Sequence, residues 1–210
     1  MTKRSFNARW MHRGSWFLSW ILHPSFVPTY TVFLLFRFNR YLDYMVPAGM
    51  KYLMFFVVFL TTFFFPVSVV YVMVKTGLVD SMNLRRREER QLPYIITCVF
   101  YFAGYYLLSG WKVPKIFLLV MLGATFSAVL AMLVNFRWKI SIHMVGMGGL
   151  TGIFYALSGD FMQNMIYLLT GLFLLSGALG TSRIITGKHT PMQIYIGYIA
   201  GFLISWLVFY

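Results

Sequence analysis

Long apolar segments separated by short polar stretches run through the whole chain. A helix needs about 20 mostly apolar residues to cross the hydrocarbon core of a bilayer. No segment shows the strict alternation of a membrane strand, so helices are expected to satisfy the backbone in lipid. The apolar segments cover residues 15–36, 52–74, 93–108, 116–134, 144–157, 161–179 and 191–210. This pattern predicts an all-α, polytopic membrane helical bundle of six or seven helices, namely six core helices with or without an extra N-terminal helix.

The first apolar segment, 15–36, differs from the others because helix breakers interrupt it. His23 and Pro24 lie near its middle, and Pro28 follows. Proline lacks a backbone N–H and kinks or ends a helix, so we expect a kink or a re-entrant turn here. The extra N-terminal helix is accordingly either re-entrant or spanning. The preceding basic residues resemble the start of a signal peptide, but no small-residue cleavage site follows, so we expect the segment to remain in the mature protein.

Each crossing moves the chain to the other side of the membrane, which sorts the polar connections into two groups. The connections 75–92, 135–143 and 181–190 share one side, called face A from here on. The opposite face holds 38–51, 110–115, 158–160 and the C-terminus. Face A collects the basic residues Arg85, Arg86, Arg87, Arg90, Arg137, Lys139, Arg183 and Lys188. It also carries His143 and His189, which makes it the candidate functional face.

Composition supports a membrane protein and narrows its partners. Hydrophobic residues make up 60% and charged residues 11% of the 210 positions, whereas a soluble domain carries roughly 25% charged residues. The net charge of +13 does not indicate nucleic-acid binding, because the basic residues stand in short connections between apolar segments. The positive-inside rule and anionic lipid headgroups explain such charges better. With no internal repeat, residues 1–210 are expected to form a single integral membrane domain.

Two histidines on face A carry the candidate chemistry. His143 and His189 each stand where a helix is expected to begin, with Lys139 and Arg183 a few residues before them. Backbone N–H groups at a helix start and the helix dipole both favour an anion there. Arginine binds phosphate oxygens in a bidentate manner. One histidine can then attack phosphorus while the other protonates the leaving alcohol.

The spacing of these residues resembles that of the type 2 phosphatidic acid phosphatase superfamily, the membrane lipid phosphate phosphatases. Ser182 and Arg183, followed after five residues by His189, are similar to the third motif of that family. Residues 141–143, which read Ser-Ile-His, resemble the core of its second motif. The resemblance covers roughly residues 116–210, the motif-bearing half of the chain.

The resemblance implies a fold, an activity and a set of roles. The family has a core of six transmembrane helices and hydrolyses phosphorylated lipids with no metal or other cofactor. His189 would be the nucleophile that forms a phosphohistidine, His143 the general acid, and Arg183 with Ser182 the phosphate-binding pair. Further phosphate contacts are expected from Lys139, Arg137, Ser141 and Arg90. The implied substrate is a phosphomonoester or diphosphate lipid, and the implied location is a bacterial inner membrane.

The chain departs from the family pattern at several positions. The third motif of the family has an aspartate four residues after its histidine, where this chain has Gln193. An amide oxygen orients the imidazole of His189 but adds no negative charge, so we expect a slow reaction or one that needs a pH high enough to keep His189 neutral. Gln193 also fits a capping box with Thr190. Ile140 and Ile142 replace the proline and glycine of the second motif, and the first motif is absent in its usual form.

Two functions from different classes stay open. The first is a lipid phosphate phosphatase, a phosphoric ester hydrolase. The second is a catalytically impaired relative that binds lipid phosphate or a membrane partner. Gln193→Asp distinguishes them, because it should raise turnover if only the missing charge limits the rate. A transporter is disfavoured, since the apolar segments contain no acidic residue. The expected partners are the lipid substrate and membrane lipids, while the oligomeric state and the orientation of face A are left open.

Overall fold

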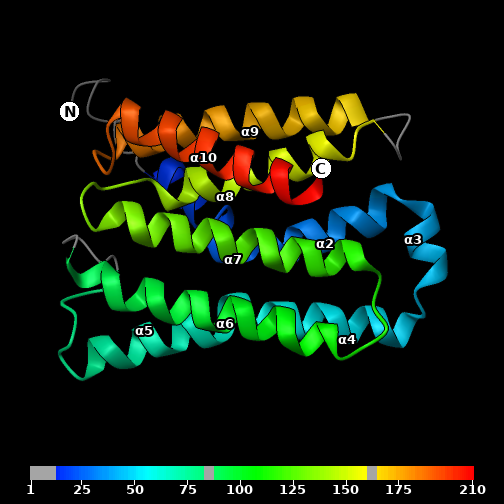
Figure 1. Ribbon diagram of the computed structural model, residues 1–210. Coiled ribbons are helices and arrows are strands. Elements are labelled where there is room, and N and C mark those ends of the chain that lie inside the picture. Colours follow the sequence, from blue (N-terminus) through cyan, green and yellow to red (C-terminus); the bar gives the residue numbers. More distant parts are fainter. Residues whose placement is uncertain (1–12, 83–87, 160–164) are drawn as a thin grey trace.

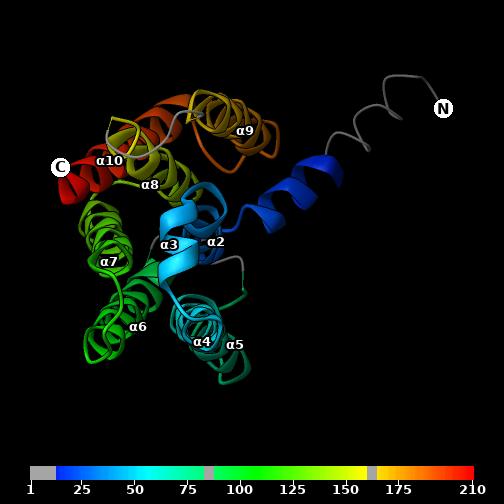
Figure 2. The same cartoon turned by 90° about the vertical axis from the view of Figure 1, so that its right-hand side faces the viewer.

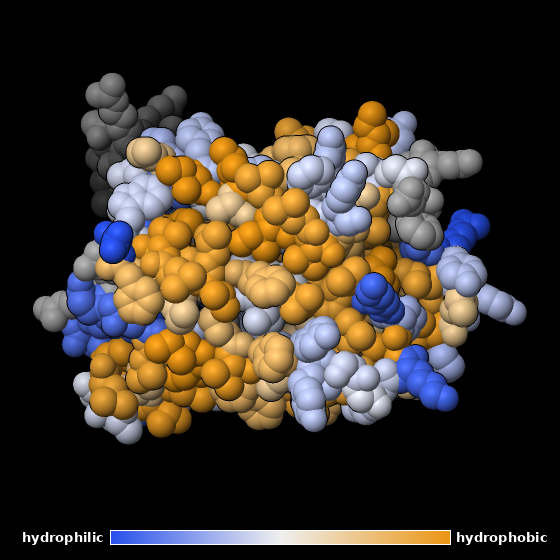
Figure 3. Space-filling view, in the orientation of Figure 1, coloured by the Kyte–Doolittle hydropathy of each residue, from blue (hydrophilic) through white to orange (hydrophobic). Residues whose placement is uncertain are grey.

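The computed structural model describes residues 13–82, 88–159 and 165–210, and these residues form helices and no strand (Figure 1). Six helical segments are long and apolar enough to cross a membrane. They are Arg13–Phe38, Ala48–Lys75, Glu88–Ser109, Lys115–Asn135, Met165–Ile185 and Pro191–Phe209. Apolar side chains cover most of the face shown in Figure 3, and hydrophilic ones gather mainly at its two ends. The chain is therefore an integral, multi-pass membrane protein, and the expected all-α bundle is confirmed.

The spans are divided by local breaks into shorter elements. A helix over residues 13–21 comes first. After it follow η1 (Pro24–Phe26), α2 (Val27–Phe38), α3 (Arg40–Met45), α4 (Ala48–Phe59), the π-helical η2 (Leu60–Phe64), α5 (Phe65–Lys75), η3 (Glu88–Arg90), α6 (Gln91–Ser109), α7 (Lys115–Asn135), α8 (Ile142–Ala156), α9 (Met165–Ile185) and α10 (Pro191–Phe209). The expected face A residues Arg85, Arg86 and Arg87 lie outside the described residues.

The predicted division into two faces is seen in the arrangement of the described connections. The ends of the connections α5–α6, α7–α8 and α9–α10 lie together at one end of the bundle, on the left in Figure 1. The short helix α3 and the α6–α7 connection lie at the other end. Face A is therefore a real end of the molecule, where residues far apart in sequence meet.

The expected break at His23-Pro24 is confirmed and turns the N-terminal helix away from α2 (Figure 2). His23 has extended backbone angles, and Pro24 starts η1. The break is held in place by Thr62 of η2, whose hydroxyl donates to the Ser25 carbonyl at 3.0 Å. Helix 13–21 contacts the face A ends of α8 and α9 through Ser15 and Ser19. Its described residues thus stay on the face A side and do not return to the opposite face.

The short helix α8 lies inside the bundle and crosses α10 at very close range. Most of its residues are buried. A Cβ added at Gly148 would overlap the Tyr198 carbonyl, and one added at Gly201 would overlap the Val145 carbonyl. Glycines therefore allow the two backbones to touch. This packing fixes the start of α8, where His143 lies, against the start of α10.

The structure corrects one boundary that matters for the site. The stretch 181–190 was expected to be a polar connection, but α9 continues to Ile185 and includes Ser182 and Arg183 in its last turn. The hydroxyl of Thr181 is satisfied within the helix, where it donates to the Gly177 carbonyl at 2.9 Å. The helix ends instead before Gly187, whose φ of 64° is the left-handed conformation that suits glycine.

Candidate active site

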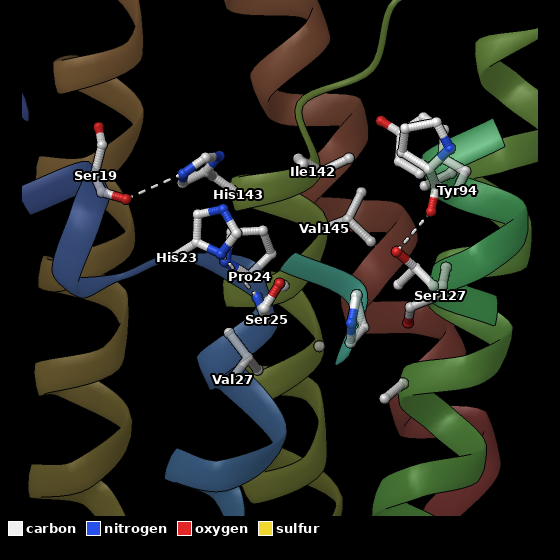
Figure 4. Close-up of a pocket in the computed structure, with 18 of the residues that line it drawn as sticks. Ser19, His23, Pro24, Ser25, Val27, Tyr94, Ser127, Ile142, His143 and Val145 are labelled. Atoms are coloured by element: carbon white, nitrogen blue, oxygen red, sulfur yellow. Dashed lines mark hydrogen bonds between the residues drawn. The ribbon is translucent and has the colours of Figure 1, made fainter. Parts of the chain in front are cut away.

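A cavity of about 700 Å³ begins at face A and extends into the bundle between α2, α6, α7 and α8 (Figure 4). Its inner part is lined mainly by apolar and small side chains such as Val27, Val120, Ala128 and Ile153. Its outer part is cationic and holds His23, His143, His189, Arg90, Lys139, Arg183 and Lys188. Among the described lining residues there is no aspartate or glutamate. The cavity is therefore complementary to a molecule that has an anionic headgroup and an apolar chain.

His189 lies between α9 and α10, and the start of α10 fixes its ring. The Gln193 side-chain oxygen accepts a hydrogen bond from the Thr190 backbone N–H at 3.2 Å and lies 3.1 Å from His189 Nδ1. A backbone N–H can only donate, so the Gln193 atom between them is the oxygen, and Nδ1 must carry the hydrogen. The lone pair of neutral His189 is then on Nε2.

Both sequence-based interpretations of Gln193 are satisfied by this geometry. Thr190 and Gln193 form the capping box at the start of α10, and the same Gln193 oxygen contacts His189. Capping and orientation are therefore one arrangement rather than alternatives. The Gln193 amide orients the His189 ring, but it carries no negative charge.

The protonation state of His189 differs from the expectation. Burial, followed by the charge of Arg183, lowers the pKa of His189 to about 3. The charges of Lys139 and Arg90 act in the same direction, and the Gln193 hydrogen bond opposes them. His189 is thus neutral over the ordinary pH range. High pH is not needed to keep His189 neutral in this arrangement, because burial and then the charge of Arg183 already favour the neutral ring.

His143 is the second residue of α8, and only 7% of it is exposed. Its Nε2 lies 3.1 Å from the Ser19 carbonyl oxygen. A carbonyl can only accept, so Nε2 carries a hydrogen and donates it. The Nδ1 atom is buried and has no hydrogen-bond partner among the described residues. His143 is therefore held through one nitrogen, while its other nitrogen is buried and unpaired among the described residues.

The cationic residues differ in how they meet the cavity. Arg183 is 7% exposed, lines the cavity, and its Nε has no hydrogen-bond partner among the described residues. Lys139 and Arg90 also line it. Burial, followed by the charges of Arg90 and Arg183, lowers the pKa of Lys139. These three cations, from three separate elements, are thus close enough to repel one another, an arrangement that favours binding of an anion between them.

Three residues expected to bind phosphate lie outside the cavity lining. Arg137 has an exposed side chain. Ser141 is fully buried at the start of α8, and its hydroxyl has no partner among the described residues. Ser182 points to the N-terminal helix, where its hydroxyl donates to the Ser15 carbonyl at 2.9 Å and lies 3.3 Å from the Ser19 hydroxyl. Their phosphate-binding roles stay predictions. In the structure Ser182 joins the end of α9 to the N-terminal helix.

The residues predicted for the site do not include the N-terminal segment, where a kink or re-entrant turn was favoured over a role of His23 in the site. The Ser19 carbonyl holds His143, and His23 lines the cavity beside it. Position 19 could not be found from sequence, because the contact uses the backbone. His23 did carry a signal, since an ionisable residue inside an apolar membrane segment is usually functional.

The described arrangement can bind an anion, attack it and protonate a leaving group. Nε2 of His189 offers a lone pair, Nδ1 of His143 can exchange a proton, and Arg183 can hold oxygens. Among the described residues no group of histidine, cysteine, aspartate and glutamate has the arrangement of a metal site. Comparison of the chain with protein-family models, with curated proteins and with solved structures gave no match.

Proposed function

We propose that this protein is a lipid phosphate phosphatase of a bacterial inner membrane, which hydrolyses a phosphomonoester or diphosphate lipid. The observation that carries the proposal is the shared lining of one cavity by His143, Arg183 and His189. The two histidines are held by opposite nitrogens, His189 through Nδ1 and His143 through Nε2. This leaves His189 as the nucleophile and His143 as the proton carrier, the two roles that phosphoryl transfer through histidine requires.

In the proposed first step, Nε2 of His189 attacks phosphorus and the bond from phosphorus to the lipid oxygen breaks. For this step His143 must carry a second proton on Nδ1, a form that the negative charge of the bound phosphate favours, and it gives that proton to the departing lipid oxygen. In the second step a water attacks the phosphohistidine, neutral His143 takes the water proton, and phosphate leaves His189. Arg183 and Lys139 stabilise the charge on the phosphoryl oxygens, where most of the catalysis of phosphoryl transfer arises.

The shape of the cavity supports a lipid rather than a soluble phosphate as substrate. Binding sites for small molecules are mostly apolar with a few placed polar groups, and they measure about 300–1,000 Å³. The cavity of about 700 Å³ has its charged residues and histidines at the face A end, and its walls inside the bundle are mainly apolar and small side chains. A soluble phosphate ester would leave those apolar walls unused.

A second candidate function is a binding protein for lipid phosphate that has lost turnover. One observation favours it, namely that Gln193 contacts His189 where a carboxylate would stabilise the cationic phosphohistidine. The binding groups, Arg183 and Lys139, would be the same in both cases.

Phosphate release from a panel of phosphorylated lipids in mixed micelles tests the proposal. Wild-type protein should release phosphate, while His189→Ala and Arg183→Ala should lower the rate to the background. Lys112→Ala is the matched control, because Lys112 is exposed on the α6–α7 connection at the opposite face and should leave the rate unchanged. No release from any lipid by wild-type protein or by a variant with a carboxylate at position 193 would favour the binding protein.

A further inference from the structure

His23 lies at the break between helix 13–21 and η1, and its ring lines the cationic end of the cavity. Its Nδ1 lies 3.3 Å from the Ser25 backbone nitrogen and accepts a hydrogen bond from it. A backbone N–H can only donate, so Nδ1 holds a lone pair, and in the neutral ring the hydrogen is on Nε2. His23 thus presents one N–H donor on the ring edge away from Ser25.

That edge of His23 is turned toward His143 (Figure 4). The two ring centroids are 5.5 Å apart and the ring planes are nearly perpendicular, at 82°. Arg183 lines the same part of the cavity and has a buried Nε without a partner among the described residues. Groups from the N-terminal segment, α8 and α9 therefore face one space from different directions.

Capping of η1 alone does not explain an imidazole at this position. Serine, threonine, asparagine and aspartate accept such a hydrogen bond with smaller side chains and are the preferred caps. An ionisable ring in a membrane-embedded segment is costly, and such residues usually mark a binding site or a proton path. The additional property of His23 is its second nitrogen, which is on the ring edge turned toward His143.

We propose that His23 is a third ligand-binding histidine, whose Nε2–H donates to a non-bridging oxygen of the bound phosphate. The identity of this ligand rests on the proposed phosphatase function. A neutral donor adds a hydrogen bond without adding another positive charge beside Arg183. It also means that the site requires the N-terminal segment as well as the motif-bearing half, 116–210.

Two variants separate ligand binding from capping, because each keeps one nitrogen position of the ring. His23→Asn keeps an acceptor near the position of Nδ1 and removes the donor near Nε2. His23→Gln keeps an amide donor near Nε2 and does not reproduce the short cap. The full-length protein is measured for phosphate release from micellar lipid, for inhibition by orthovanadate, and for stabilisation by inorganic phosphate in thermal unfolding.

With His23→Asn we expect wild-type thermal stability, but orthovanadate inhibition and kcat/KM weakened by about 10- to 100-fold, the range for a hydrogen bond to a charged group. His23→Gln should recover part of that loss even if its stability falls. The proposal is overturned if His23→Asn binds orthovanadate and inorganic phosphate as wild type does, or if His23→Gln is the more impaired in binding. The phosphate-stabilisation assay needs no turnover, so it tests His23 even where wild-type protein proves inactive and the phosphatase proposal fails.

Discussion

At the scale of single residues, hydrogen bonds at two nitrogens decide the chemistry of the site. The Gln193 oxygen places the lone pair of His189 on Nε2, and the Ser19 carbonyl places the hydrogen of His143 on Nε2. Neither assignment depends on a carboxylate. The chain therefore keeps the orientation that a catalytic histidine needs while lacking the charge that usually accompanies it.

Gln193→Glu restores that charge without shortening the side chain. The length matters because the Gln193 oxygen reaches both Thr190 N–H and His189 Nδ1, and glutamate also forms capping boxes. The carboxylate should stabilise the cationic phosphohistidine and raise kcat. It should also raise the pKa of His189 from about 3 by about 1 to 3, as an opposite charge at this range does.

The direction of the pH effect follows from the need for neutral His189. In wild type, protonation of His189 removes no activity above about pH 4, since its pKa is about 3. In Gln193→Glu the raised pKa should bring a new loss of kcat/KM on the acidic side. The measurement is kcat/KM from pH 4 to pH 9, with Gln193→Leu as the uncharged control. If kcat/KM of Gln193→Glu does not fall at acidic pH, the assignment of His189 as nucleophile is contradicted.

At the scale of elements, the end of α9 is tied to the N-terminal helix by Ser182. Ser182→Ala removes the hydrogen bond to the Ser15 carbonyl and the contact with the Ser19 hydroxyl. We expect a loss of about 1 kcal/mol and weaker holding of His143 by the Ser19 carbonyl. Hydrogen exchange should therefore become faster in residues 13–22.

Thr181→Ala is the control for this change. The neighbouring Thr181 hydroxyl donates within its own helix, to the Gly177 carbonyl, and does not contact the N-terminal helix. Its removal should leave exchange in residues 13–22 unaltered. If Ser182→Ala leaves that exchange unaltered too but weakens orthovanadate inhibition, Ser182 binds phosphate as the sequence resemblance implies.

The crossing of α8 and α10 gives a second prediction at this scale. Gly201→Ala would force a Cβ into the Val145 carbonyl, and a packed backbone cannot yield easily there. Overpacking of this kind costs about 1–3 kcal/mol or more. Gly171→Ala on α9 is the control, since its Cβ meets nothing within 4 Å. Thermal unfolding in detergent should show a lowered midpoint for Gly201→Ala alone, and equal midpoints would show that the two helices separate readily.

At the scale of the whole molecule, the sequence predicted the fold well and the site in part. Apolar length and the parity of crossings were enough to assign the helices and to bring His143 and His189 to one face. The end of α9 was misplaced because Gly180 and the polar residues after it look like a helix terminus in sequence, although the helix continues and the Thr181 hydroxyl bonds within it. The backbone contact of Ser19 with His143 links positions 124 residues apart, and side-chain patterns carry no signal for it.

The burial of Arg183 at the cationic end of the cavity has a consequence for ionic strength. Mobile ions screen exposed charges over about 8 Å in physiological salt, but they screen buried charges much less. Arg183 is a permanent charge and is 7% exposed, so dissolved salt has little access to it. The part of the affinity for a lipid phosphate that comes from Arg183 should accordingly change only slightly between dilute and concentrated sodium chloride. A protein that holds anionic lipids through exposed lysines would release them under the same change.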